Sequence, residues 1–177
     1  MRLKTNFPLY CINLPSMSRQ RKSGELFILE ELLNSLTHGL GFLLSCLGMY
    51  LLVRNIPEEN HVLKLICFLV YASSMVVLFA SSTLYHWFHA HKHAGRWQIV
   101  DHAAIFVLIA GSYTPFSLLV LRGAWGWTIF AIIWGLAIIG IIFKLLGGRK
   151  YRRFSVFLYL LMGWLVIIAV KCLFRRC

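Results

Sequence analysis

Five long apolar blocks constrain this chain more than any other feature of its sequence. A helix needs roughly 20 mainly apolar residues to cross the hydrocarbon core of a bilayer, and each block has about that length. Unpaired backbone groups are not tolerated in lipid, so each block is predicted to be an α-helix. The predicted fold is therefore an all-α, polytopic transmembrane helix bundle. Its spans are expected at about Asn34–Val53, Leu63–Phe88, Ile99–Leu121, Trp125–Leu146 and Phe154–Leu173.

The positive charge of the chain lies between these blocks and before the first of them. The formal net charge is +12, and the mean hydropathy is +0.74. Basic residues gather in the N-terminal arm and in the second and fourth connections, while the first and third connections carry little net charge. Only cytoplasmic loops are strongly basic under the positive-inside rule. The alternation predicts a multi-pass membrane protein with a cytoplasmic N-terminus, and it gives no reason to expect a nucleic-acid partner.

The first 24 residues differ from the rest of the chain. Residues 1–24 are polar and basic, with no apolar core and no small-residue cleavage site, so they do not resemble a signal peptide. We expect them to form a loose cytoplasmic arm that precedes a transmembrane domain at 25–177. The first helix is expected to begin near Glu25.

Two ionisable residues mark a candidate site where the second block ends and the third begins. Asp101 is the only acid inside any of the five blocks. An acid at that position is costly, so it should face protein or a water-filled cavity, and it is a functional candidate. His86 should lie at a similar depth, because a short connection joins the two blocks. From spacing alone, His86 is equally a zinc ligand or an interfacial histidine in an aromatic belt. Asp101 could be a ligand, an orienting group or a general base.

Other polar positions could support this site. Glu31, Asn34 and His38 share one helix face, and they would either support the site from a second layer or form a polar rim at the membrane surface. Ser82 lies one turn before His86 on the same helix face. The histidines of the loop 89–93 could capture a metal, although a solvated basic loop is the better interpretation.

Small residues and turn residues give further expectations about packing. Gly41 and Ser45 have a spacing that permits close helix contact, and so do Ala131 and Gly135. The segment Gly111–Pro115 should kink the third helix, with hydroxyl groups available to the freed backbone groups. The cysteines have no CxxC spacing and predict no disulfide framework.

Taken together, these motifs resemble the hemolysin III family, the bacterial branch of the progestin and adipoQ receptor superfamily, which is also similar to the alkaline ceramidases. The resemblance covers about Glu25–Leu173. The motifs that carry it are Glu31-x-x-Asn34-x-x-Thr37-His38, Ser82-x-x-x-His86, Asp101 with the following Ile109–Phe116 segment, Gly126-Trp127 and Gly163-Trp164.

The resemblance implies a seven-span protein with zinc near its cytoplasmic face. His86 would then be a zinc ligand, and Asp101 would hold the zinc-bound water as a catalytic residue, with Ser82 beside them. Glu31, Asn34 and His38 would be supporting residues. The family's two further zinc histidines belong to an H-x-x-x-H motif in the seventh span, and no span of this sequence contains that motif. The expectation is therefore a chain that lacks the last two spans, which a partner polypeptide could supply.

Three functions follow from these observations as expectations. The first is a zinc-dependent hydrolase acting on an amide-bearing membrane lipid, so the enzyme assignment stays open. The second is a membrane-perturbing or pore-forming protein. The family name implies this function, and with it cytolysis. The third is lipid sensing or homeostasis without turnover. Because the polar residues gather at one membrane face, a site is favoured over a pore. Membrane lipids are the expected partners, and the resemblance implies a bacterial inner membrane.

Overall fold

The computed structural model describes the backbone of residues 15–147 and 152–174, and the side chains of 25–147 and 153–167. All its regular elements are helical, and no strand occurs in the described residues, which confirms the all-α prediction. The elements are α1 (Pro15–Arg54), α2 (His61–Trp87), α3 (Ala94–Pro115), the π-helical segment η1 (Phe116–Leu121), α4 (Gly123–Gly147) and α5 (Arg152–Phe174).

Each predicted span coincides, to within one residue, with part of one of these helices or of a helix and its π-helical continuation. Four segments are long and apolar enough to cross a membrane: Glu25–Arg54, His61–Trp87, Ala94–Leu121 and Gly123–Gly147. The fifth helix, α5, is 23 residues long, and its part with described side chains, Arg153–Ile167, is also apolar. Several helices of spanning length in one chain make this an integral, multi-pass membrane protein.

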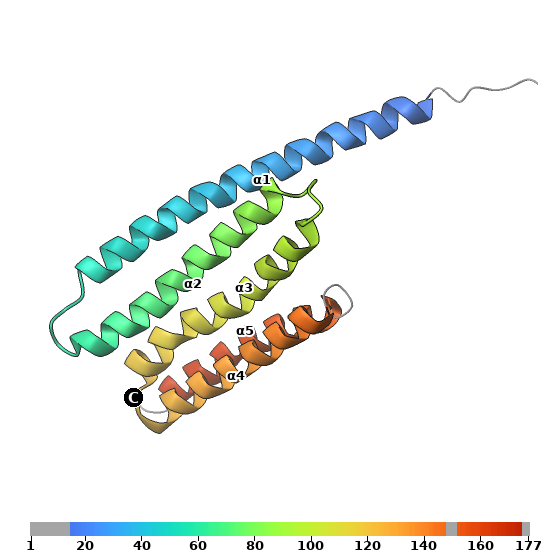
Figure 1. The fold of residues 1–177 in the computed structure, drawn as a ribbon. Helices are drawn as coiled ribbons and strands as arrows, with labels where there is room; N and C mark the ends of the chain where they lie inside the picture. Colours follow the sequence, from blue (N-terminus) through green and yellow to red (C-terminus); the bar gives the residue numbers. More distant parts are fainter. Residues whose placement is uncertain (1–14, 148–151, 175–177) are drawn as a thin grey trace, which may run out of the picture.

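Helix α1 begins earlier than the sequence predicts. It starts at Pro15 rather than near Glu25 and runs for 40 residues. Proline suits the first position of a helix, because its fixed φ is already helical and its missing N–H would have no partner there. A helix of this length extends about 60 Å, roughly twice the thickness of the hydrocarbon core. Its N-terminal part therefore projects beyond the neighbouring helices (Figure 1), and residues 15–24 are helical rather than loose.

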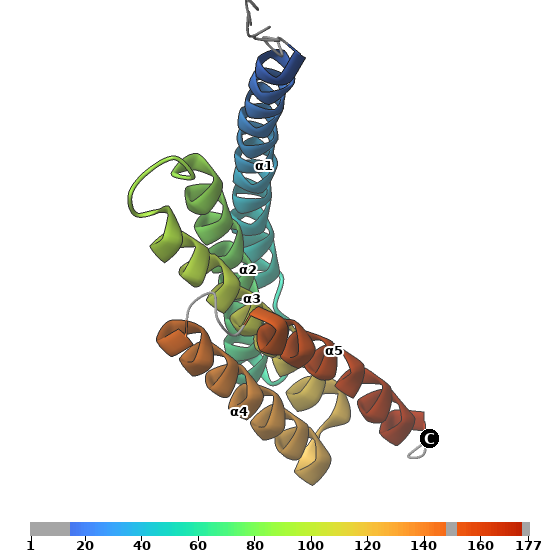
Figure 2. The same cartoon turned by 90° about the vertical axis from the view of Figure 1, so that its right-hand side faces the viewer.

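The helices are arranged around α3. Figure 1 shows α1, α2 and α3 side by side in chain order, with α4 and α5 beyond α3, and Figure 2 shows α4 and α5 as two separate helices. The buried core lies between α3, α4 and α5 and includes Phe106, Ile133 and Met162. Tyr113 Oη in α3 donates to the carbonyl of Met162 in α5 at 2.8 Å. Since α3 contacts both groups of helices, it is the element that can hold a site in place.

Close helix contacts occur at glycines, but not always at the predicted ones. A Cβ built on Gly41 would lie 2.6 Å from the Phe79 ring in α2, so the expected close contact of α1 with its neighbour is present. The Ala131–Gly135 expectation is wrong, because Ala131 is exposed and a Cβ on Gly135 would meet nothing within 4 Å. Helix α4 instead approaches its neighbours through Gly126 and Gly140.

The segment Gly111–Pro115, where a kink was predicted, is followed directly by a change of helix type. Helix α3 ends at Pro115, and η1 continues with wider turns. The N–H of Arg122 donates to the carbonyl of Ser117 at 3.2 Å, a hydrogen bond across five residues. The Ser117 hydroxyl donates to the Tyr113 carbonyl at 2.7 Å. Side-chain hydroxyls thus bond to backbone groups near the proline, as a membrane helix requires.

Candidate functional site

A glutamate and a histidine from neighbouring helices form the centre of the candidate site. Nδ1 of His86, near the end of α2, lies 2.6 Å from Oε2 of Glu31 in α1, and their side chains are 16% and 13% exposed. When Nδ1 carries a proton and donates it to a carboxylate, Nε2 of the same ring keeps a free lone pair. A carboxylate in this position fixes the orientation of a metal-binding histidine in many proteins.

His38 completes a cluster with these two residues. Its ring stacks on that of His86, with centroids 5.5 Å apart and an interplanar angle of 11°. On its other side it contacts the Phe79 ring at 6.0 Å. Glu31 and His38 are seven residues apart on α1, so both face α2. We call Glu31, His38 and His86 the acid–histidine cluster.

Asp101 lies at the same end of the bundle, close to this cluster. Its side chain is 14% exposed, and Oδ2 lies 3.8 Å from Nδ1 of His102. Its charge acts on both His38 and Tyr159, so Asp101 lies within electrostatic range of α1 and α5. Among the described residues no hydrogen bond or ion pair joins Asp101 to His86. The predicted pair is therefore brought to one region without direct contact.

The other predicted site residues differ in where they lie. Ser82 is 5% exposed and sits one turn before His86 in α2. Asn34 is exposed, so it does not join the acid–histidine cluster in this structure. The loop histidines pack on aromatic rings instead: His89 contacts Phe27 at 5.7 Å, and His91 contacts Phe88 at 5.6 Å.

Helices α5 and α3 support the region around Asp101 through contacts that the sequence did not predict. Tyr159 Oη donates to the carbonyl of His102 at 2.7 Å, and its ring contacts that of Phe106 at 4.3 Å. Gln98 Nε2 donates to Tyr85 Oη at 3.1 Å, which joins α3 to α2. The only sign of the Tyr159 contact in the sequence is that Tyr159 is the one tyrosine in the apolar fifth block. Its position does not show that it bonds to the His102 carbonyl.

The donor set fits one position of a zinc site rather than a complete one. A catalytic zinc usually has three protein ligands. Within the part of the chain whose side chains are described, no three His, Cys, Asp or Glu side chains are grouped so that they could share a metal ion. His86, oriented by Glu31, suits a single ligand position. We therefore derive no reaction step through a metal.

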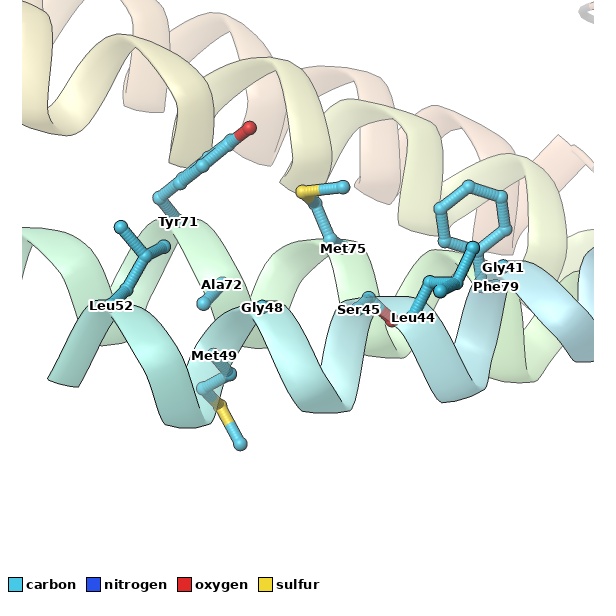
Figure 3. A pocket seen from close by; sticks show the side chains of 10 residues that line it. All are labelled: Gly41, Leu44, Ser45, Gly48, Met49, Leu52, Tyr71, Ala72, Met75 and Phe79. Atoms are coloured by element: carbon cyan, nitrogen blue, oxygen red, sulfur yellow. The ribbon is translucent and has the colours of Figure 1, made fainter. Parts of the chain in front are cut away.

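An apolar groove adjoins the acid–histidine cluster. It has a volume of about 410 Å³ and lies between α1 and α2, where Figure 3 shows its lining side chains. Phe79 lines the groove and also contacts the His38 ring. The groove is thus continuous with the cluster through one side chain. Its lining residues are Gly41, Leu44, Ser45, Gly48, Met49, Leu52, Tyr71, Ala72, Met75 and Phe79.

Comparison with known proteins agrees with the motifs. The sequence model of the family described as Haemolysin-III related matches residues 27–177. Hemolysin-3 of Bacillus cereus is 45% identical over 150 residues, which cover 85% of this chain and 68% of that protein. The Hemolysin-3 homolog of Bacillus subtilis (strain 168) is 43% identical over 147 residues, which cover 83% and 69%. No solved structure matches the chain. Since the family match covers most of the chain, from within α1 onward, the chain belongs to the haemolysin-III-related family.

Proposed function

We propose that this protein acts on membrane lipids at the acid–histidine cluster, in a hydrolase-type reaction on an amide-bearing lipid. The observation that carries the proposal is the partly buried Glu31–His86 contact of 2.6 Å beside the groove of about 410 Å³. The groove suits an acyl chain, because its lining is almost entirely apolar and it lies between two helices of membrane-spanning length. A lipid seated there would place its polar part near His38 and His86.

Each polar residue has a role in this proposal. Glu31 holds the His86 ring so that Nε2 is free, and Asp101 supplies a carboxylate that can hold or accept a proton. Ser82 offers a hydroxyl one turn from His86. Zinc, which the family resemblance implies, would supply Lewis-acid polarisation of the amide carbonyl. His86 would be its ligand from this chain, and further ligands would come from outside the described side chains, with a partner polypeptide as one source.

We also propose that the N-terminus and the connection at 88–93 face the cytoplasm of a bacterial inner membrane. The basic residues of the alternate connections support this orientation. In a chain whose five cysteines are replaced by alanine, a membrane-impermeant thiol reagent added to whole cells should label Glu58→Cys and not Lys92→Cys. Labelling of Lys92→Cys alone would reverse the orientation and move the site to the outer face.

Proteoliposomes test the proposed reaction. The purified chain is reconstituted with an N-acylated lipid or with a matched ester lipid, and fatty acid release is measured with and without added zinc. We expect zinc-dependent release from the amide lipid when a polypeptide that supplies the further zinc ligands is reconstituted with the chain, and this release should fall at least tenfold in His86→Ala and in Asp101→Asn. His61→Ala is the matched control, because His61 is an exposed histidine at the other end of α2. Equal release by the His86→Ala and His61→Ala variants would contradict the assignment.

A second function, membrane permeabilisation, is favoured by one observation: two similar proteins carry the name Hemolysin-3. The structure gives a physical reason against a pore within one chain, since the described Asp, Glu, Lys and Arg side chains lie toward the ends of the candidate spans and none lies midway along one. Loading the same vesicles with a dye separates the two functions. Protein-dependent dye release that survives His86→Ala would favour the pore.

A further inference from the structure

We propose that the hollow at the start of α3 binds the head group of an anionic phospholipid of the surrounding membrane. The hollow has a volume of about 380 Å³ and is lined by His93, Arg96, Trp97 and Val100. We call these four residues the connection site. This proposal does not depend on the hydrolase function, since none of these residues belongs to the acid–histidine cluster.

The basic side chains at this site lack an acidic partner. The ion pairs between described side chains are His86–Glu31 and His102–Asp101. Arg96 and Lys92 are both exposed, and neither forms an ion pair with a described acid. Arg96 also stands in the first turn of α3, where the helix dipole disfavours a cation. A bound phosphate group would interact favourably with the guanidinium and with the helix N-terminus together.

Two of the other three lining residues, Trp97 and Val100, form an apolar wall, which indicates a lipid rather than a free anion. The Trp97 ring stacks on Phe88, with centroids 6.2 Å apart and an interplanar angle of 19°, so the indole is held as a fixed wall. Val100 lies on the same side of α3 as Trp97 and is 43% exposed. A phospholipid presents a phosphate next to a glycerol and acyl chains. Along α3 the connection site presents first the Arg96 guanidinium, which would meet the phosphate, and then Trp97 and Val100, which would meet the acyl chains.

The position in the bundle agrees with this ligand. The connection site lies at the beginning of the candidate span Ala94–Leu121, where the helix would enter the hydrocarbon. Tryptophan is enriched at this depth in membrane proteins. Basic pockets at the same depth bind anionic head groups, and each basic residue contributes about 1 kcal/mol near the membrane surface.

Lipid titration tests the proposal. The full chain is purified in detergent and titrated with phosphatidylglycerol or with phosphatidylcholine, and bound lipids are counted by native mass spectrometry. We expect tighter binding of phosphatidylglycerol, and about a fivefold loss of that affinity in Arg96→Gln. Arg96→Lys should keep most of the affinity, and Lys92→Gln should have a smaller effect than Arg96→Gln, because Lys92 does not line the hollow.

The matched control is Arg122→Gln, which removes an exposed arginine at the other end of the α3–η1 segment. Its phosphatidylglycerol affinity should be unchanged. The proposal is overturned if the Arg96→Gln and Arg122→Gln variants bind phosphatidylglycerol with equal affinity. It is also overturned if the wild-type chain binds phosphatidylglycerol and phosphatidylcholine with equal affinity. Inorganic phosphate that displaces the lipid at equal concentration would also overturn it, because the site would then be one for a free anion.

Discussion

Replacing His86 by alanine is expected to lower the free energy of unfolding by about 1–3 kcal/mol. The physical reason is the partner that remains: Glu31 would keep a carboxylate that is only 13% exposed and has lost its contact at 2.6 Å. An unpaired charge in such a place costs more than the hydrogen bond itself contributes. Unfolding of the purified chain in mixed micelles by sodium dodecyl sulfate, followed by circular dichroism, measures the change.

The double variant distinguishes a pairing effect from a packing effect. Replacing both residues by leucine removes the two polar groups together, so the variant should recover most of the stability that either single replacement loses. His61→Ala should change stability by no more than about 0.5 kcal/mol, because it is an exposed surface substitution. If the stability that the double variant loses relative to wild type equals the sum of the two single losses, the two side chains act independently and their contact has no structural role.

The sequence was sufficient for the fold class and for the positions of the spans. Block length decides both, because a membrane imposes the same requirement on every apolar block regardless of its neighbours. The start of α1 was missed because residues 15–24 carry no apolar block, and a helix that leaves the membrane does not need one.

For the candidate site, the sequence could predict which residues share a face of one helix, but not which residues of different helices meet. Spacing placed Glu31 and His38 on one face, and this face does contact α2. It could not show that His86 meets Glu31, because periodicity within a helix does not fix how its neighbour is rotated or shifted along it. Asn34 was grouped with them on spacing, yet it is exposed. The contact of Tyr159 with the His102 carbonyl joins residues 57 positions apart, which no local pattern reports.

Helix α4 shows why small-residue spacing alone was misleading. The block is apolar on every side, so no polar stripe marks the face that is exposed to lipid. Ala131 and Gly135 have the right spacing and face outward. The buried face carries Gly126, Ile133 and Gly140. Which small residues make contact is therefore a property of the packed bundle.

Gly126→Ala is expected to be the most damaging single methyl addition in α4. A Cβ at this position would lie 2.2 Å from the backbone carbonyl oxygen of Ser117, which belongs to η1 and has no side-chain freedom to move. Overpacking of this kind costs about 1–3 kcal/mol and occasionally more, and we expect the upper end of that range. The same micelle unfolding assay measures it.

Two further glycines of the same helix make this prediction specific. Gly140→Ala would meet the Phe106 ring at 2.3 Å, and a ring can shift where a backbone carbonyl cannot, so its cost should be smaller. Gly135→Ala meets nothing within 4 Å, and alanine favours the helix by up to about 1 kcal/mol over glycine, so this variant should be neutral or slightly more stable. Gly126→Ala should therefore be the least stable of the three. An equal loss at Gly135 would mean that α4 packs through the face that the sequence spacing had suggested.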